Sequence, residues 1–372
     1  MNGVERRLRG KRVVICAGSG GVGKTTTSAA LAMGLAARGK RVAVVTIDPA
    51  RRLANSLGLQ ELGNEPRLVD PERLAGHGIE MRGELWAMML DAKRTFDELI
   101  DRLAPDPQTR DEVLENRIYQ QLSGAVAGSQ EFTAVAKLYE LDRSGRFDAI
   151  VLDTPPSRNA LDFLDAPDRL THFFEGRALK VFLAPTGLAA RVMGRGTSVV
   201  FGLLRRLTGV DLLEDLGVFF RALGGLLDGF RERAEGVKAL LGDAGTTFLV
   251  ITSPEREPVE EAIFFRGKLR DARMPFGGLI VNRVHPLVHD ELEPDAVLAD
   301  LREPLGDALA GKVARTWAEE LVLARRDAAA LEHLRDRTGE REPIVVPQLE
   351  GDVHDVGGLV LMHEHLFAEG AA

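Results

Sequence analysis

Residues 18–25 read Gly18-Ser19-Gly20-Gly21-Val22-Gly23-Lys24-Thr25, which fits the phosphate-binding pattern G-x-x-x-x-G-K-[ST]. The apolar segment RVVICA at 12–17 precedes it and predicts a buried strand, and TTSAALAMGLAA at 26–37 predicts a helix. Glycines let backbone N–H groups surround a phosphate chain, and the helix N-terminus adds the positive end of its dipole. We therefore predict that this loop, with Thr26 behind it, binds nucleotide phosphates. Lys24 would reach the β- and γ-phosphates, and the Thr25 hydroxyl would ligate Mg²⁺.

Composition narrows the class of protein. The chain has 372 residues, of which 45% are hydrophobic, so it can bury a sizeable core. Its net charge of −8 gives no basic footprint for nucleic acid. The single cysteine, Cys16, excludes an internal disulfide and a C-x-x-C metal site. Because we see neither a signal peptide nor an apolar run of roughly 18 residues, we expect a soluble, cytoplasmic protein.

Two acidic residues follow predicted strands. Asp48 comes directly after the apolar run at 41–47, and Asp153 ends the run FDAIVLD at 147–153, which has the Walker-B form. Carboxyl ends of parallel strands gather at the ligand edge of a doubly wound sheet. Further strands are predicted at 84–91, 246–252, 277–281 and 343–346, with helices between them. We also expect a flexible lead-in at 1–10, a connecting loop at 61–78 and a terminal helix at 356–367. This alternation predicts an α/β fold with a doubly wound, mostly parallel sheet.

A long apolar stretch interrupts the strand and helix alternation. We predict a single domain over 1–372, with a helical subdomain inserted at 170–241. Its apolar residues recur at helical spacing and form one stripe: Leu212, Leu213, Leu216, Phe219, Phe220, Leu223, Leu226, Leu227 and Phe230. Such a stripe most often packs the subdomain's own core. It also fits a groove for a hydrophobic client helix, or a partner surface.

Five segments resemble the ArsA family, which joins arsenite-pump ATPases to the ATPases that target tail-anchored membrane proteins. They are GSGGVGKTT at the loop, TIDPARRL at 46–53, DTPPSRNALDFLDAP at 153–167, VNRV at 281–284 and VVPQLEGDVHDVGGL at 345–359. These segments are spread over nearly the whole chain, and they look closest to one half of an actinobacterial pair of ArsA-like ATPases. The resemblance implies a P-loop NTPase fold of the SIMIBI class and a dimer with MgATP at its interface.

The resemblance also implies roles for individual residues. Asp48 would orient or deprotonate the attacking water, and Asp153 would stand near Mg²⁺ through its water shell. Asn282 would hydrogen-bond adenine, and Pro347 would line the base pocket. Plainer interpretations remain for three of them: a helix cap or turn at Asp48, a turn acid at Asp153, and a strand-terminating turn at Asn282.

Ser19 departs from the family's pattern. The family normally has lysine after the first glycine, and that lysine crosses the dimer to the partner's ATP. A cation supplied in trans can be worth roughly 10³- to 10⁵-fold in rate. Either a lysine-bearing paralogue completes a heterodimer, or Arg51 or Arg52 supplies the charge in a homodimer. The family's zinc-binding cysteine pair and arsenite-binding cysteine cluster are both absent from this sequence.

These observations favour an ATP-hydrolysing dimeric switch that handles a hydrophobic or membrane-associated client. The first rival is the energising subunit of a membrane anion pump. The second is a positioning ATPase of the ParA or MinD kind, which would need a basic surface or tail. The segment 356–372 has no lysine or arginine, which counts against it. A small-molecule kinase is the third, and the TIDPARRL and DTPPSRN segments argue against it.

Overall fold

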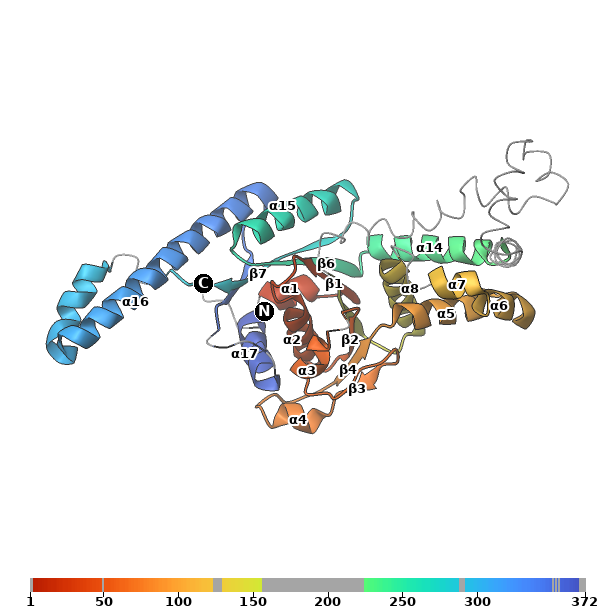
Figure 1. Cartoon of the computed structure of the whole chain (residues 1–372), viewed down its shortest axis with the longest axis horizontal. Coiled ribbons are helices and arrows are strands. Elements are labelled where there is room, and N and C mark those ends of the chain that lie inside the picture. The colour runs from red at the N-terminus through yellow and green to blue at the C-terminus, as the bar shows by residue number, and fades with distance from the viewer. Residues whose placement is uncertain are drawn as a thin grey trace, which may run out of the picture. The chain divides into compact units, whose positions relative to one another are not determined.

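The computed structural model describes residues 3–48, 50–122, 129–155, 224–287, 292–349, 351, 353 and 355–367 (Figure 1). The chain divides into two compact units. One comprises Met1–Met89, Gly145–Leu161 and Gly242–Ala372, and the other Leu90–Ser144 and Asp162–Leu241. Most of the predicted 170–241 subdomain lies outside the described residues, as does the DTPPSRN segment from residue 156 onward. The boundaries of that subdomain stay a prediction.

The first unit contains an eight-stranded sheet in the order β3-β4-β2-β5-β1-β6-β7-β8. All neighbouring pairs are parallel except β3 with β4. The strands are β1 (Val13–Gly18), β2 (Arg41–Thr46), β3 (Arg67–Leu68), β4 (Glu84–Met89), β5 (Ala149–Asp153), β6 (Thr246–Thr252), β7 (Phe276–Val284) and β8 (Ile344–Pro347). The predicted α/β fold with a mostly parallel sheet is therefore confirmed.

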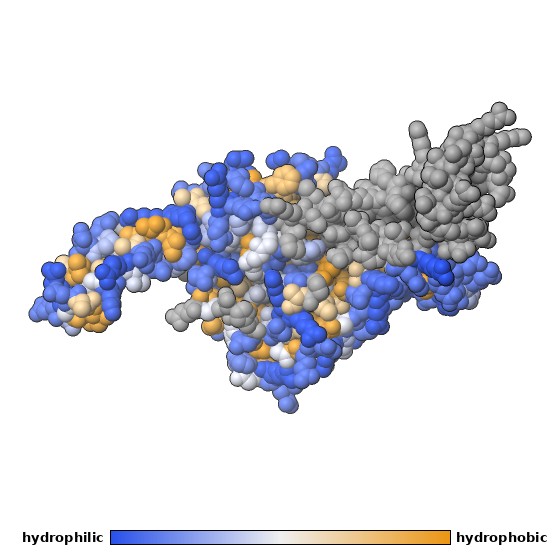
Figure 2. Space-filling model, in the orientation of Figure 1, coloured by the Kyte–Doolittle hydropathy of each residue, from blue (hydrophilic) through white to orange (hydrophobic). Residues whose placement is uncertain are grey.

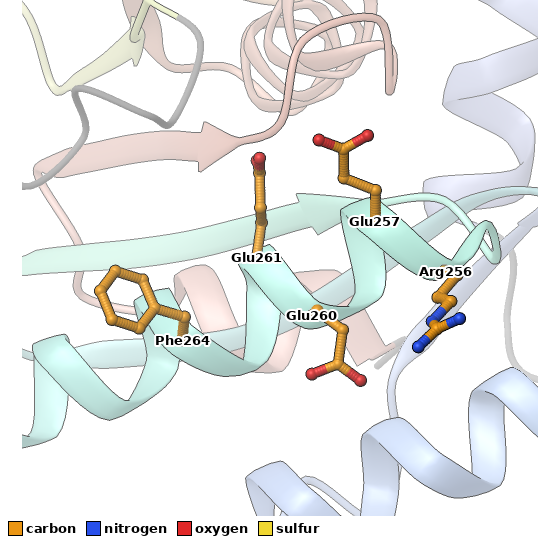
Figure 3. A pocket seen from close by; sticks show the side chains of 5 residues that line it. All are labelled: Arg256, Glu257, Glu260, Glu261 and Phe264. Atoms are coloured by element: carbon orange, nitrogen blue, oxygen red, sulfur yellow. The ribbon is translucent and has the colours of Figure 1, made fainter.

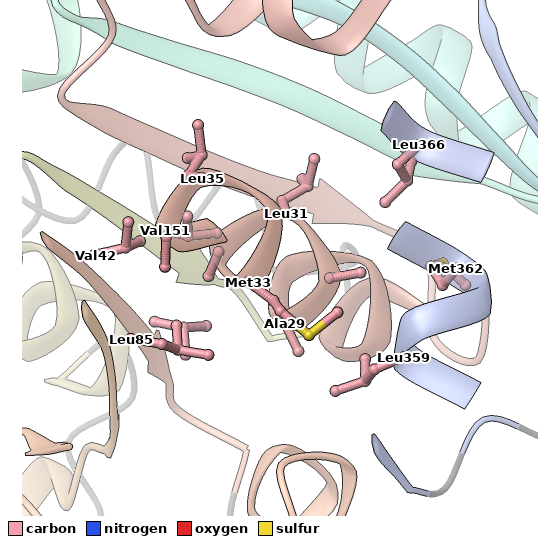
Figure 4. Close-up of a cluster of buried hydrophobic side chains, with 14 of the residues drawn as sticks. Ala29, Leu31, Met33, Leu35, Val42, Leu85, Val151, Leu359, Met362 and Leu366 are labelled. Carbon is pink, nitrogen blue, oxygen red and sulfur yellow. The ribbon is translucent and has the colours of Figure 1, made fainter. Parts of the chain in front are cut away.

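Helices of the first unit cover both faces of this sheet, because the central strands are apolar on both sides. Alternate β1 residues such as Val14 and Cys16 belong to a core cluster shared with α2 and α17. Figure 4 shows part of this cluster, including Leu31 of α2 and Leu359 of α17. The intervening residues are equally buried, and α15 packs against β6, β1 and β7. The helices are α1 (Gly3–Leu8), α2 (Lys24–Ala37), α3 (Arg52–Ser56), α4 (Pro71–Ala75), α15 (Arg256–Asp271), α16 (Pro294–Thr338) and α17 (Val356–Phe367).

Two short helices correct the sequence interpretation. Residues 1–10 were expected to be a flexible lead-in, but α1 forms there because Val4 and Leu8, one helical turn apart, are both buried. The polar segment 61–78 was expected to be a loop, yet it contains α4. Asp70 caps α4 by accepting a hydrogen bond from the Glu72 amide, and Pro71 occupies the first helical position.

Helix α16 exposes apolar side chains, visible in orange along this helix in Figure 2. Leu305, Leu309 and Val322 are 40%, 49% and 67% exposed. The helix bends at Gly306, whose φ of 74° lies outside the helical region. Single exposed leucines are common on protein surfaces. These residues would therefore indicate a binding surface only if a partner covers them.

In the second unit the described helices are α5 (Ala92–Leu103), α6 (Pro107–Leu114), α7 (Arg117–Leu122), α8 (Ser129–Ser144) and α14 (Leu227–Gly242, to residue 241). Phe96 stacks on Phe230 with ring centroids 5.7 Å apart. Leu226 and Phe230, at the end of the predicted apolar stripe, are 0% and 1% exposed. These two residues therefore lie in the core, and the residues of the stripe up to Leu223 lie outside the described part.

The close approach of α17 to α2 gives a testable stability difference. A Cβ atom built on Gly34 of α2 would lie 2.2 Å from the ring of Phe367 in α17. Gly34→Ala is therefore expected to lower the free energy of unfolding by about 1–3 kcal/mol. Gly267→Ala is the matched control, because Gly267 lies inside α15 with nothing within 4 Å of its built Cβ. It should raise stability by up to about 1 kcal/mol. Equal urea midpoints for the two variants would contradict the packing argument.

Candidate nucleotide-binding site

The phosphate loop runs from the end of β1 to the start of α2, and a residue of β7 contacts its backbone. Gly23 has φ 88°, and a Cβ atom built there would lie 2.4 Å from Nδ2 of Asn282. That Nδ2 donates a hydrogen bond of 2.9 Å to the carbonyl of Val22. Glycine is thus required at position 23 both by its backbone conformation and by the amide beneath it. The structure places Asn282 against the loop's backbone, and its predicted contact with adenine stays a prediction.

The carboxyl ends of β1, β2 and β5 bring Lys24, Thr25 and Asp153 together. In the sheet register Thr46 lies opposite Asp153, and so does Cys16. Thr25 Oγ1 donates a 2.6 Å hydrogen bond to Asp153 Oδ2. Lys24 Nζ donates to the carbonyl of Ser19 at 2.6 Å, so it folds back across the loop. Residues that the sequence separates by more than a hundred positions thus share one buried site.

Asp153 is the most strongly perturbed acid in this site. It is 2% exposed, and its Oδ1 is buried without a hydrogen-bond partner among the described residues. Burial raises the pKa of Asp153 to about 6, against the opposing effect of the hydrogen bonds from Thr25 and Thr46. A bare buried carboxylate oxygen beside a threonine hydroxyl is the donor set that a hydrated Mg²⁺ ion prefers. The residues present therefore fit the metal that the family implies.

Lys24 adds a buried cation to the same edge. Its side chain is 7% exposed, and burial lowers the pKa of Lys24 while the charges of Asp153 and Asp48 raise it. Buried ammonium and carboxylate groups are costly unless they are paired. An anionic phosphate chain would complete this arrangement by satisfying Lys24 and the loop amides together.

Asp48 follows β2 and is more exposed than Asp153. Its Oδ1 accepts a 2.9 Å hydrogen bond from the Ala50 amide, so the turn role considered for it is present. Its side chain is 30% exposed, and Arg52 Nε lies 3.9 Å from its Oδ2. Asp48 lines a hollow of about 210 Å³ together with Thr46, Arg51, Leu53, Ala54, Glu61, Leu62 and Met89. The neighbouring Pro49 lies outside the described residues.

Ser19 contacts an acid that sequence reasoning missed. Its Oγ donates a 2.5 Å hydrogen bond to Oε2 of Glu261 in α15. Figure 3 shows Glu257 and Glu261 on the side of α15 toward β1 and its loop, and Arg256 and Glu260 on the other side. Glu261 is 242 positions away from Ser19 in sequence, so only the packing of α15 on the sheet reveals the pair. The position where the family has lysine thus carries a neutral side chain beside a carboxylate.

Pro347 and Thr46 are two further residues near the site, each at the end of a strand. Pro347 pairs in register with Val284, two residues after Asn282, so both predicted base-pocket residues lie at one end of neighbouring strands. Thr46 was not singled out in the sequence, although a lone polar residue at the end of the apolar run RVAVVT is a visible signal. Its hydroxyl donates to Asp153 Oδ2 at 2.9 Å.

Fold and loop together define a P-loop nucleotide-binding protein, and the comparisons with known proteins narrow this class. The chain matches the anion-transporting ATPase family over residues 11–300. It is 30% identical over 298 residues to ATPase ARSA1 of Chlamydomonas reinhardtii, covering 74% of this chain and 35% of the algal protein. The chain belongs to the ArsA family of ATPases.

Two other relatives show the range of names in this family. ATPase get3 of Aspergillus terreus is 35% identical over 159 residues, covering 42% of this chain and 43% of the fungal protein. Putative arsenical pump-driving ATPase 1 of Aquifex aeolicus is 28% identical over 257 residues, covering 68% of this chain and 58% of that protein. The matched regions span less than two thirds of each of these three relatives. In the described ranges, no helix has the length and apolar character needed to span a bilayer.

Proposed function

We propose that this chain binds MgATP, hydrolyses it in a dimer, and uses the cycle to handle a hydrophobic or membrane-associated client. The observation that carries the proposal is the buried Asp153, which holds the Thr25 hydroxyl through one oxygen and leaves the other without a described partner. This pair, Lys24 and the loop amides favour a polyphosphate with its metal over a neutral ligand. The exposed apolar residues of α16 support a hydrophobic partner or client.

In this proposal each residue has a distinct task. Lys24 exchanges the Ser19 carbonyl for phosphate oxygens, and the amides of residues 20–25 bind the phosphate chain. Thr25 and Asp153 would hold Mg²⁺, Asp153 through a water of the metal, and the ion would supply positive charge beside the β- and γ-phosphates. Asp48 orients the attacking water or accepts its proton, as the family resemblance implies, and its side chain is 30% exposed, so water can reach it.

ATP turnover by the purified chain tests the dimer part of the proposal. If a lysine-bearing paralogue normally supplies a trans cation, the chain alone should hydrolyse ATP slowly. Ser19→Lys combined with Glu261→Gln should then raise turnover roughly tenfold or more, because a trans cation stabilises transition-state charge. The Glu261 change is included because that carboxylate would otherwise hold the introduced lysine. Turnover by the wild-type chain alone at about 1 s⁻¹ or faster would rule out the heterodimer.

The same ATPase assay tests whether an arginine of this chain, rather than a partner's lysine, supplies the positive charge. Arg52 lies beside Asp48, and its charge lowers the pKa of Lys24. If it serves as a cation in cis, Arg52→Ala should reduce the turnover of the wild-type chain, and Ser19→Lys should add little. Arg51→Ala is the matched control, because Arg51 pairs instead with Glu61 at 3.5 Å.

An arsenite-stimulated pump subunit is the alternative suggested by one relative's name. Cys16 argues against metalloid binding, because it is fully buried and burial raises the pKa of its thiol to about 12. Thiolates are the ligands for soft metalloids, and this thiol stays protonated and enclosed. Arsenite added to the ATPase assay should therefore leave turnover unchanged.

A further inference from the structure

Thr46 ends β2 between the two acids of the site. Thr46 is buried, with 2% of its surface exposed. Oγ1 donates to Asp153 Oδ2 at 2.9 Å and accepts a hydrogen bond from the Asp48 amide at 3.2 Å. One hydroxyl thus uses both its donor and its acceptor capacity, and links the buried acid of β5 to the backbone of the segment after β2.

This link continues into the Asp48 turn. Asp48 Oδ1 accepts from the Ala50 amide, and Arg52 begins α3 two residues later. A short chain of hydrogen bonds therefore runs from Asp153 through Thr46 to the turn that carries the Asp48 carboxylate. Parallel pairing of β2 with β5 places Thr46 directly opposite Asp153, so the sheet itself fixes the first contact.

Thr25 contacts the same carboxylate oxygen but cannot serve as this link. Its hydroxyl shares Asp153 Oδ2 with Thr46 and is the predicted ligand of Mg²⁺. Thr46 differs from Thr25 because its hydroxyl also accepts a hydrogen bond from the Asp48 amide. Every other residue of β2 after Arg41 is Val or Ala, so a buried hydroxyl at this strand end is unusual for the segment. Burying a hydroxyl costs free energy unless it is hydrogen-bonded, as it is here.

We propose that Thr46 is a positioning residue that couples the metal-binding acid Asp153 to the Asp48 turn. It touches neither nucleotide nor water in this role. Its hydroxyl holds the Asp48 backbone at a fixed distance from Asp153, so that occupation of the metal site and placement of the Asp48 carboxylate are linked. The effect on turnover rests on the proposed ATP hydrolysis. The hydrogen-bonded link between Asp153 and the Asp48 turn does not depend on it.

Two variants distinguish the effect of the Thr46 hydroxyl from the effect of the side chain's shape. Thr46→Val keeps the β-branched volume and removes both hydrogen bonds, whereas Thr46→Ser keeps the hydroxyl and removes a methyl group. For nucleotide-free protein, hydrogen exchange of the peptide spanning 44–53 is measured by mass spectrometry. Thr46→Val should add about one to two rapidly exchanging amides, those of Asp48 and Ala50, and Thr46→Ser should match the wild type. Unchanged exchange in Thr46→Val would overturn the link, whatever the protein's activity.

ATP turnover then tests whether this link affects hydrolysis. Thr46→Val should lower ATP turnover roughly 10- to 100-fold, as expected for a lost hydrogen bond to a charged group, with the KM for MgATP within about twofold. Thr46→Ser should recover most of the rate. Equal turnover in all three proteins would overturn the coupling. A wild-type chain that binds MgATP without hydrolysing it, alone or with a partner, would instead refute the proposed function. The exchange result would still decide the link.

Discussion

Asp48→Asn is expected to lower ATP turnover roughly 10²- to 10⁴-fold, the usual worth of a positioned general base. Asparagine keeps a side-chain oxygen to accept the Ala50 hydrogen bond, so the turn should persist. Binding of MgATP should stay within about threefold of the wild type, because Asp48 is not placed among the phosphate ligands. Single-turnover kinetics and calorimetric binding would measure the two quantities separately.

Glu61→Gln is the matched control for Asp48→Asn. Glu61 lines the same hollow and pairs with Arg51, but the site assigns it no contact with phosphate, metal or water. Removing its charge should leave turnover within about twofold of the wild type. If both variants lose activity equally, the cause is the charge of the hollow, and the assignment of Asp48 as base is wrong. Loss of MgATP binding in Asp48→Asn would also contradict it.

Asp153→Asn is expected to abolish Mg²⁺-dependent turnover while stabilising the nucleotide-free protein. The pKa of Asp153 is about 6 in the folded chain against an ordinary value of 3.8. Between these values the folded state binds more protons, so the free energy of unfolding falls as pH rises from about 4 to 6. Above pH 6 the full cost of the buried charge is present, about 1–3 kcal/mol, and the attraction to Lys24 is already included in it. Asparagine has no such cost.

Urea denaturation at pH 5, 6 and 7.5 would measure this difference. The advantage of Asp153→Asn should be largest at pH 7.5 and shrink toward pH 5. Asp148→Asn provides a control of opposite sign, because hydrogen bonds from Arg41 lower the pKa of Asp148 to about 2. That variant should be less stable than the wild type at all three pH values, with little change among them. A destabilised Asp153→Asn at pH 7.5 would contradict the account of the buried acid.

Much of the fold was predictable because the strands of the sheet are buried on both faces. Continuous apolar runs such as TTFLVIT at 246–252 have no other common explanation, and β6 occupies those residues. Helix α17 likewise has the predicted bounds of 356–367. Two short helices, α1 and α4, were not predicted because they have too few residues to show helical periodicity. Helix α1 depends on the packing of Val4 and Leu8, and α4 on the Asp70 cap.

The site was predictable only where a motif spans consecutive residues. Lys24, Thr25, Asp48 and Asp153 stand next to strands whose ends the alternation already fixed. Glu261 and Asn282 reach the loop from distant elements, and their contacts depend on which helix covers the sheet and on the crossing from β6 to β7. Thr46 could have been found from its position at a strand end, but its hydrogen bonds require the register with β5.

The packing of α17 against α2 has a consequence for synthesis of the chain. Between Ala29 and Ala36, α2 is apolar and every residue is buried, and α17 packs against this helix. Residues 356–367 leave the ribosome more than 300 positions after α2. Until then the helix behind the phosphate loop has an uncovered apolar side, and such surfaces promote aggregation. We expect the growing chain to need protection by a chaperone until α17 emerges, and nucleotide binding to mature only after that point.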